Sequence, residues 1–385
     1  MGTNDAASAV AATAPFACGA AAAGKSGQRP AQDPARRPGQ TPARKRVLYF
    51  DALNIAACFA VLVMHFNGLV HSYAPTAAWA QALVGECISY WAVPVFFMLS
   101  GATLMEYRRR YDTATFLKKR VARTVVPFVA WSLIILVWKV ATGQLEPPVG
   151  PRSLISMIIN TQIIDIYWFF IPLFAIYLCM PVLSCLADGK HDRVLWYAVA
   201  CAFITSSVLP CVCTLVGITY NASFMFPLLS GYLMFPVLGY LLAKTELTRG
   251  VRWGIYAAGI AGFLLRFVST LVLSSPEAGM YQVFWGPTNF PTVMLAVAVF
   301  VLFKQIPWER LFSTSGRVRA LATASGASFG IYLTHMVFFY YAGALTGLDG
   351  SRLLWRTVMP FVAYAVCLVG TLVMKRIPGV RAIVP

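Results

Sequence analysis

The chain has 385 residues, of which 59% are hydrophobic and only 12% are charged, whereas an average soluble domain has about 25% charged residues. This composition excludes an ordinary soluble enzyme, a disordered protein and a coiled coil, and it predicts an all-α, polytopic transmembrane helical bundle. The net charge of +17 is interpreted as a topology signal, and no nucleic-acid partner is expected.

The first 46 residues differ in composition from the rest of the chain. They are rich in Ala, Gly, Pro, Gln and Thr, and they end in a cluster of three basic residues. Such a segment cannot bury enough apolar surface to fold, so residues 1–46 are predicted to be a disordered basic tail. A membrane domain over residues 47–376 and a short cytoplasmic C-terminal tail over residues 377–385 are expected to follow.

Apolar segments of helical length come next, separated by short polar links. About 20 apolar residues are needed to cross a bilayer, and on this basis we expect about ten spans. No internal repeat is evident, which argues against an inverted-repeat transporter. The expected spans are residues 47–70, 85–105, 121–142, 163–185, 194–218, 226–243, 252–273, 289–303, 320–343 and 354–374.

The basic residues are distributed asymmetrically about these spans. With the N-terminus in the cytoplasm, 26 of the 31 Lys and Arg residues fall in or next to cytoplasmic segments, three in outer links and two within spans. Cytoplasmic loops of membrane proteins carry such an excess of basic residues. The pattern predicts that both termini are cytoplasmic and that the protein is a multi-pass component of the cell (inner) membrane.

The first span carries a polar stripe. On an α-helix, Asp51, Asn54, Cys58 and His65 fall within about 60° of one another. Asn54 and His65 lie about 16 Å apart along the helix axis, and Asp51 lies near the cytoplasmic face. Ionisable residues within a span are costly and usually functional, so His65 is a candidate catalytic residue. The alternative is a seam of hydrogen bonds between helices.

The other three histidines are weaker candidates. His335 lies in the ninth span, where both packing and a role in acceptor binding are open. His71 follows the first span on the opposite side of the helix, and we expect it to be a solvated loop residue. His191 lies in a charged cytoplasmic link, where a solvated side chain is also expected.

The second and third spans supply candidates for the cytoplasmic side. Ser100 and Gly101 follow Pro94 and allow close approach to the backbone. Arg120 and Arg123 are three residues apart, so we expect them to share a helix face at the mouth of the third span. Guanidinium groups suit phosphates, and the alternative for this pair is the anchoring of lipid headgroups.

Two residues are candidates on the outer side. Trp168 belongs to an aromatic cluster at the start of the fourth span, which is typical of an interfacial belt. Arg266 lies well inside the seventh span. We expect it to snorkel to the surface, to pair with Glu277, or to hold an acidic or hydroxyl-rich substrate in an outward cavity.

The nine cysteines do not predict a disulfide framework or a metal site. Their number is odd, most lie inside apolar runs, and no Cys-x-x-Cys or Cys/His cluster occurs. They are interpreted as small apolar residues within helices.

Five motifs follow one another along the chain: the stripe from Asp51 to His65 and the segments Val93–Gly101, Phe116–Pro127, Tyr167–Pro181 and Ser325–His335. Their order resembles the membrane acyltransferase-3 family, in particular its bacterial O-acetyltransferases of the enterobacterial-common-antigen type. The resemblance covers nearly the whole chain after residue 46. His65 matches the catalytic histidine of the family. Three positions depart from the family pattern: Asn54 replaces an arginine, Ala102 an aromatic residue, and Ile166 a histidine found in many relatives.

The resemblance implies an integral-membrane O-acyltransferase, with an O-acetyltransferase expected. His65 would act as the general base for transfer from cytoplasmic acyl-CoA to a hydroxyl of an extracytoplasmic glycan or glycolipid. Acyl-CoA, expected to be acetyl-CoA, is a co-substrate, and no permanently bound cofactor or metal is expected. The bilayer is the other partner. The candidate donor-binding residues are Asp51, Asn54, Ser100, Gly101, Arg120 and Arg123, and the candidate acceptor-binding residues are Trp168, Arg266 and His335.

Two other functions remain open from the sequence. A transporter or flippase of a glycan or lipid would use the polar stripe as a conduit. A weakened relative would bind acyl-CoA without turning it over, and the replacement of the family arginine by Asn54 is the observation that suggests it.

Overall fold

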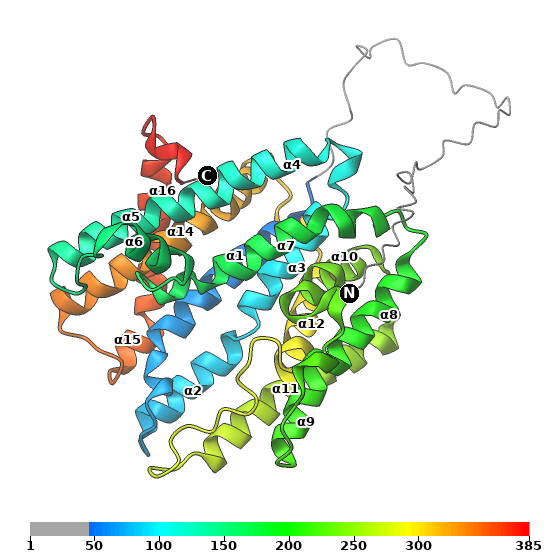
Figure 1. The fold of residues 1–385 in the computed structure, drawn as a ribbon, viewed down its shortest axis with the longest axis horizontal. Coiled ribbons are helices and arrows are strands. Elements are labelled where there is room, and N and C mark those ends of the chain that lie inside the picture. Colours follow the sequence, from blue (N-terminus) through cyan, green and yellow to red (C-terminus); the bar gives the residue numbers. More distant parts are fainter. Residues whose placement is uncertain (1–45, 385) are drawn as a thin grey trace, which may run out of the picture. The chain divides into compact units, whose positions relative to one another are not determined.

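The structure is a computed structural model that describes residues 46–384. Apart from Arg46, the predicted N-terminal tail lies outside the described residues. Residues 46–384 contain helices and no strand (Figure 1). The α-helices are α1 (Leu48–Phe66), α2 (Ala77–Ser89), α3 (Ala92–Leu104), α4 (Thr113–Arg120), α5 (Val126–Ala141), α6 (Gly150–Ile159), α7 (Phe170–Leu183), α8 (Asp192–Phe203), α9 (Leu209–Leu215), α10 (Met234–Lys244), α11 (Arg249–Leu273), α12 (Phe290–Gln305), α13 (Trp308–Leu311), α14 (Ser315–Thr346), α15 (Leu353–Thr357) and α16 (Met359–Met374).

These helices confirm the predicted all-α, polytopic fold. At least one α-helix overlaps each of the ten predicted spans, and in the described part of the chain six helical segments are long and apolar enough to cross a membrane. Helices α10, α12 and α16 are shorter apolar elements, so the count of ten crossings stays a prediction. The six segments are Leu48–Phe66, Ala77–Arg109, Thr113–Ala141, Asp165–Leu186, Asp192–Leu215 and Arg249–Leu273.

The second predicted span begins earlier than its apolar run suggests. The Thr76 side chain accepts a hydrogen bond from the backbone N–H of Trp79 and caps α2 at its N-terminus. Helix α2 therefore begins at Ala77 and not near residue 85, and a turn at Tyr90 and Trp91 joins it to α3. As a result Glu86 lies inside a helix and not at its end.

Helix α1 packs against α3, α14 and α16, while α3 also packs along α10. The contact between α3 and α10 is unusually close. A Cβ atom added to Gly101 would lie 1.8 Å from the carbonyl oxygen of Pro236, and one added to Gly239 would lie 2.1 Å from that of Met98. Small residues permit such backbone contact between helices in membranes, so these two glycines fix the position of α3.

The last described residues fold back onto the helices. The Trp131 indole N–H of α5 donates a 3.0 Å hydrogen bond to the carbonyl oxygen of Ile383, and Val384 is only 1% exposed. The short C-terminal segment after α16 is thus packed against the membrane domain.

Candidate active site

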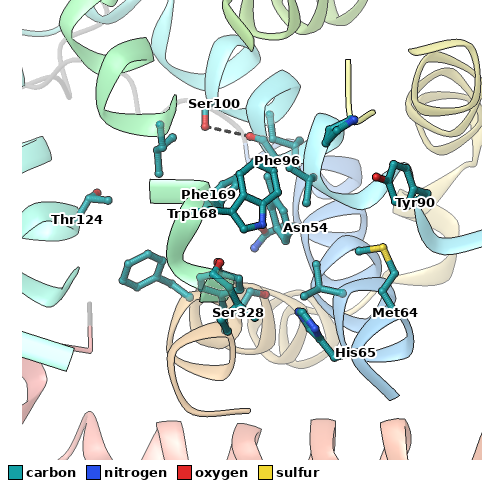
Figure 2. A pocket seen from close by; sticks show the side chains of 18 of the residues that line it. Asn54, Met64, His65, Tyr90, Phe96, Ser100, Thr124, Trp168, Phe169 and Ser328 are labelled. Atoms are coloured by element: carbon teal, nitrogen blue, oxygen red, sulfur yellow. Dashed lines mark hydrogen bonds between the residues drawn. The ribbon is translucent and has the colours of Figure 1, made fainter. Parts of the chain in front are cut away.

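A cavity of about 620 Å³ lies between α1, α3, the π-helical turn η3 (Val121–Val125), α7 and α14. Aromatic and aliphatic side chains form most of its wall, and a few polar groups are set among them. Figure 2 shows Ser100 toward one end, Asn54 and Trp168 near the middle, and His65 toward the other end. The polar lining includes Asp51, Asn54, His65, His71, Glu86, Tyr90, Ser100, Thr103, Arg120, Thr124, Ser325 and Ser328.

The polar stripe of α1 forms one wall of this cavity. Asp51, Asn54 and His65 all line it, so the predicted stripe lies along a single cavity for about 21 Å of helix. Cys58 does not line the cavity, because its thiol donates to the carbonyl oxygen of Ser328 at 3.5 Å. Three residues of the stripe therefore line the cavity, and the fourth, Cys58, contributes to the packing of α1 on α14.

Asn54 joins α1 to α14. Its side-chain amide donates to the carbonyl oxygen of Ser325 at 2.9 Å and to the hydroxyl of Ser325 at 3.1 Å. An uncharged amide can lie this close to α14 without an anionic partner. Asn54 is thus both a cavity residue and a clamp between two helices.

His65 lies beside a second histidine. The ring centroids of His65 and His335 are 5.1 Å apart, and His335 is fully buried. Nδ1 of His335 is 2.7 Å from the carbonyl oxygen of Tyr332, so this nitrogen carries the proton that is donated. Nε2 of His335 has no hydrogen-bond partner among the described residues. His335 does not line the cavity, but its ring packs against two residues that do, His65 and Tyr332.

A second cavity, of about 530 Å³, lies on another side of His65. It shares only His65 and Gly68 with the first cavity, and Trp138, Lys139 and other residues near the C-terminal end of α5 line it. His65 is therefore accessible from two separate spaces.

Ser100 and Gly101 take different positions. Ser100 lines the cavity and donates a 3.0 Å hydrogen bond to the carbonyl oxygen of Phe96, drawn dashed in Figure 2. Gly101 points the other way, toward α10, and does not line the cavity. The structure therefore places Gly101 in the packing of α3 on α10, and its assignment to donor binding stays a prediction.

The two arginines of the third span do not share a face. Residues 121–125 form a π-helical turn, which has more residues per turn than an α-helix and changes the angle between side chains three apart. Arg120 is half-buried and lines the cavity with Thr124, whereas Arg123 is exposed and does not. The guanidinium of Arg120 lies 5.6 Å from the centre of the Tyr177 ring, and its Nε has no hydrogen-bond partner in the described chain.

The start of the fourth span reaches the cavity from the opposite side. Trp168 lines the cavity and is 36% exposed. Ile166 also lines it and is nearly buried, and its carbonyl oxygen accepts a hydrogen bond from the Tyr332 hydroxyl. This hydrogen bond joins the segment to α14 through the backbone of Ile166, so it does not depend on the identity of the side chain at position 166.

Arg266 is buried rather than snorkelling to the surface. It is 2% exposed, and its Nε and Nη2 atoms donate to the carbonyl oxygen of Phe284, at 3.0 and 2.7 Å. Nη2 also donates to the hydroxyl of Thr292. The guanidinium lies 3.8 Å from the centre of the Tyr90 ring, and Tyr90 lines the cavity. Arg266 therefore supports the cavity wall from behind.

Glu86 is the cavity residue that the sequence interpretation missed. It is 4% exposed, lines the cavity with His65, and has no hydrogen-bond partner for Oε2 within residues 46–384. The available signal was a single carboxylate in a long apolar run, which would have stood out had the span been started at residue 77.

His71 is exposed, as predicted, but it also lines the cavity. Its Nε2 lies 3.9 Å from Oε1 of Glu86, too long for a hydrogen bond. Partial burial lowers the pKa of His71 from its ordinary value, so the neutral imidazole is favoured near neutral pH. We therefore treat the contact as a neutral imidazole beside a carboxyl group and not as an ion pair.

The fold and the cavity define a polytopic helical membrane protein with a histidine-containing internal site. A family model described as an acyltransferase domain matches residues 47–374, which is most of the described chain. The chain belongs to the acyltransferase-3 family and is a membrane acyltransferase. Searches among curated proteins and among solved structures returned no match.

Proposed function

We propose that the protein transfers an acyl group, in the simplest case acetyl, from cytoplasmic acyl-CoA to a hydroxyl of an extracytoplasmic glycan or glycolipid. The observation that carries this proposal is one cavity with two polar ends, in which His65 lies toward the second end. Arg120 and Asp51 lie at the first end, and Glu86 and His71 lie at the second. Such a cavity lets a donor and an acceptor approach one histidine from opposite directions.

The donor would enter from the end that holds Arg120. A half-buried guanidinium with an unpartnered Nε suits the phosphates of acyl-CoA, because charge-assisted hydrogen bonds to phosphate are strong. The pantetheine arm would then extend along α1, past Ser100 and Asn54, toward His65. Arg123, which is exposed and outside the cavity, has no part in this path.

His65 would act as the general base. An imidazole nitrogen takes the proton from the acceptor hydroxyl as the hydroxyl oxygen attacks the thioester carbon, and the carbon–sulfur bond then breaks. The imidazolium returns the proton to the departing thiolate, which leaves as CoA thiol, and the acceptor becomes an ester. A transient acyl-histidine is the alternative route. The His335 ring, in contact with His65, limits how the base can turn.

Removal of the imidazole tests the proposal. We expect His65→Ala to lower acyl transfer by at least about a hundredfold, because positioned general bases contribute that much or more. The control is His191→Ala, which removes an exposed histidine outside the cavity. Both variants should be expressed and remain monodisperse. Turnover retained in His65→Ala would rule out His65 as the base.

Release of thiol separates the enzyme from the two other functions. Purified protein given acetyl-CoA and a glycolipid extract should release CoA thiol and form base-labile ester. A transporter or flippase would do neither, and a weakened relative would bind CoA without releasing thiol.

A further inference from the structure

We infer that Glu86 binds the hydroxyl groups of the acceptor, and that the second end of the cavity selects neutral, hydroxyl-bearing molecules over amines. The inference rests on the proposed function and deepens it. It names the subsite that holds the acceptor and the chemistry that this subsite recognises.

The first argument is an unsatisfied carboxylate oxygen. Nearly all buried polar atoms in proteins have a hydrogen-bond partner, and one that lacks a partner calls for a water or a ligand. Oε2 of Glu86 is buried and has no partner in the described chain, and Oε1 has only the distant ring of His71. Because Glu86 lines the same cavity as His65, a hydroxyl donor there would complete its hydrogen bonds.

The second argument is that the carboxylate is held in place. Helix α2 packs against α1 and α11, and the neighbouring Gly85 leaves no room for a side chain, since an added Cβ would lie 2.7 Å from the side chain of Asn67. The Asn67 amide in turn donates to the carbonyl oxygens of Val63 and Arg356, at 2.8 and 3.3 Å. The orientation of α2, and with it the position of Glu86, is therefore fixed before a substrate arrives.

The third argument concerns charge. The Arg266 guanidinium lies against the Tyr90 ring, four residues along from Glu86, and acts electrostatically on the Glu86 carboxyl. Its Nε and Nη2 atoms donate to Phe284 and Thr292, and it forms no ion pair with Glu86 in the described chain. An ammonium group at this end would lose its hydration and would be repelled by the guanidinium, whereas a neutral hydroxyl can donate to Oε2 of Glu86 at a smaller desolvation cost.

The lining of this end also fits a sugar. Tyr90 at this end and Trp168 near the middle present aromatic surface to the cavity (Figure 2), and the flat apolar faces of sugar rings pack on such surface. Ligand sites commonly combine a mostly apolar wall with a few placed polar groups that fix orientation. Here Glu86 is the placed group, and His65 is the base that the bound hydroxyl would meet.

Glu86→Gln tests the inference, with Glu106→Gln as the matched control. The control removes a carboxylate that is paired with Arg109 at 3.2 Å and lies outside the cavity. Each purified full-length variant is given acetyl-CoA labelled in the acetyl group and a titrated glycolipid extract from the cells that make the protein. We expect Glu86→Gln to raise the KM for the extract about tenfold or more, with the KM for acetyl-CoA unchanged. Glu86→Asp should recover part of the loss, and Glu106→Gln should match the wild type.

The results separate failure of the inference from failure of the proposed function. Wild-type protein that releases no thiol and labels no ester would overturn both. Wild-type transfer with an unchanged extract KM in Glu86→Gln, or with donor and extract KM raised together, would overturn the inference alone. Label that survives mild base as an amide would also overturn it, because the acceptor would then be an amine. A Glu86→Gln protein that does not fold leaves Glu86→Asp as the deciding variant, which should then show the raised extract KM without a change for acetyl-CoA.

Discussion

The two ends of the cavity differ in how their polar groups are satisfied. At the end that holds Arg120, a half-buried guanidinium lies beside exposed basic residues on the same chain segment. At the end that holds Glu86, a buried carboxyl group has one oxygen without a partner in the described chain, and the nearby Tyr90 ring is packed against the Arg266 guanidinium. The first arrangement suits a highly charged ligand that arrives from water, and the second suits a neutral ligand that must replace water.

The difference shows that one helix can serve two chemical environments. Asp51 and His65 lie on the same face of α1, yet the walls opposite them come from different elements. Near Asp51 the wall includes α3 and η3, whereas near His65 it includes the segment before α2, α2 itself and the turn that follows α2. The partners of a helix, and not the helix alone, set what each part of its face can bind.

The roles proposed for the two ends of the cavity depend first on which end faces the cytoplasm. The test is a reporter at the C-terminus, which is expected to be either fully active or silent. The asymmetric charge predicts that both termini, and with them the Arg120 end, are cytoplasmic. A reporter that is active only inside the cell, fused after Pro385, should be active. A second reporter that is active only outside should be silent at the same position. The reverse pattern would exchange the roles proposed for the two ends.

The next largest effect is expected at the Arg120 end. Arg120→Ala should raise the KM for acetyl-CoA about tenfold to a hundredfold, because it removes charge-assisted hydrogen bonds to phosphate. Arg123→Ala is the matched control and should change the KM less than about twofold, since Arg123 is exposed and outside the cavity. Arg120→Lys should recover the affinity only in part. Titration of CoA measured by calorimetry checks these values without turnover, and an equal loss in both Ala variants would show that the two arginines act together.

A smaller effect, on stability, is expected at Asn54, which lies near the middle of the cavity between its two ends. Asn54→Ala removes two hydrogen bonds between α1 and α14 and should destabilise the protein by about 0.5–1.5 kcal/mol. The melting temperature in detergent measures it. Ser325→Ala removes only the hydroxyl partner, and the double variant should lose less than the sum of the two single losses. Additive losses would show that Asn54 stabilises the fold by other contacts.

The smallest expected effect lies at the Glu86 end and concerns pH. Burial lowers the pKa of His71 in the folded state, so the corresponding stability is present above about pH 6.5 and is lost as the pH falls through the lowered pKa. The wild-type melting temperature should therefore fall between pH 7.5 and pH 5, and His71→Gln should reduce that fall slightly. His191→Gln, which alters an exposed histidine next to Asp188, should leave the fall in place. A fall that becomes larger in His71→Gln would mean that His71 forms an ion pair with Glu86.

The sequence predicted the α1 wall of the cavity and Arg120 better than the remaining groups at the Glu86 end, for a physical reason. The spacing of Asp51, Asn54 and His65 places them on one face of a helix, and Arg120 belongs to a cluster of basic residues that is evident in the sequence. The roles of Gly101 and Arg123 could not be read in the same way. Gly101 depends on where α10 crosses α3, and Arg123 depends on a π-helical turn that the residue spacing does not reveal.

The Glu86 end is assembled from residues far apart in the chain. Arg266 packs against Tyr90, which lies about 175 residues away in the sequence, and its hydrogen bonds go to the backbone of Phe284 and to the side chain of Thr292. No period or motif links these positions. The fold class and the helix positions follow from composition and from apolar length, which are local properties, and so they were predictable.

The contact between α3 and α10 affects the cavity without being part of it. Ser100, Thr103 and Leu104 form the cavity side of α3, and Gly101 lies on its back, against Pro236. A single methyl group added at Gly101 would have to push α3 off α10 and into the space beside α1. The width of the cavity at this end therefore depends on Gly101, a residue on the side of α3 that faces α10 and not the cavity.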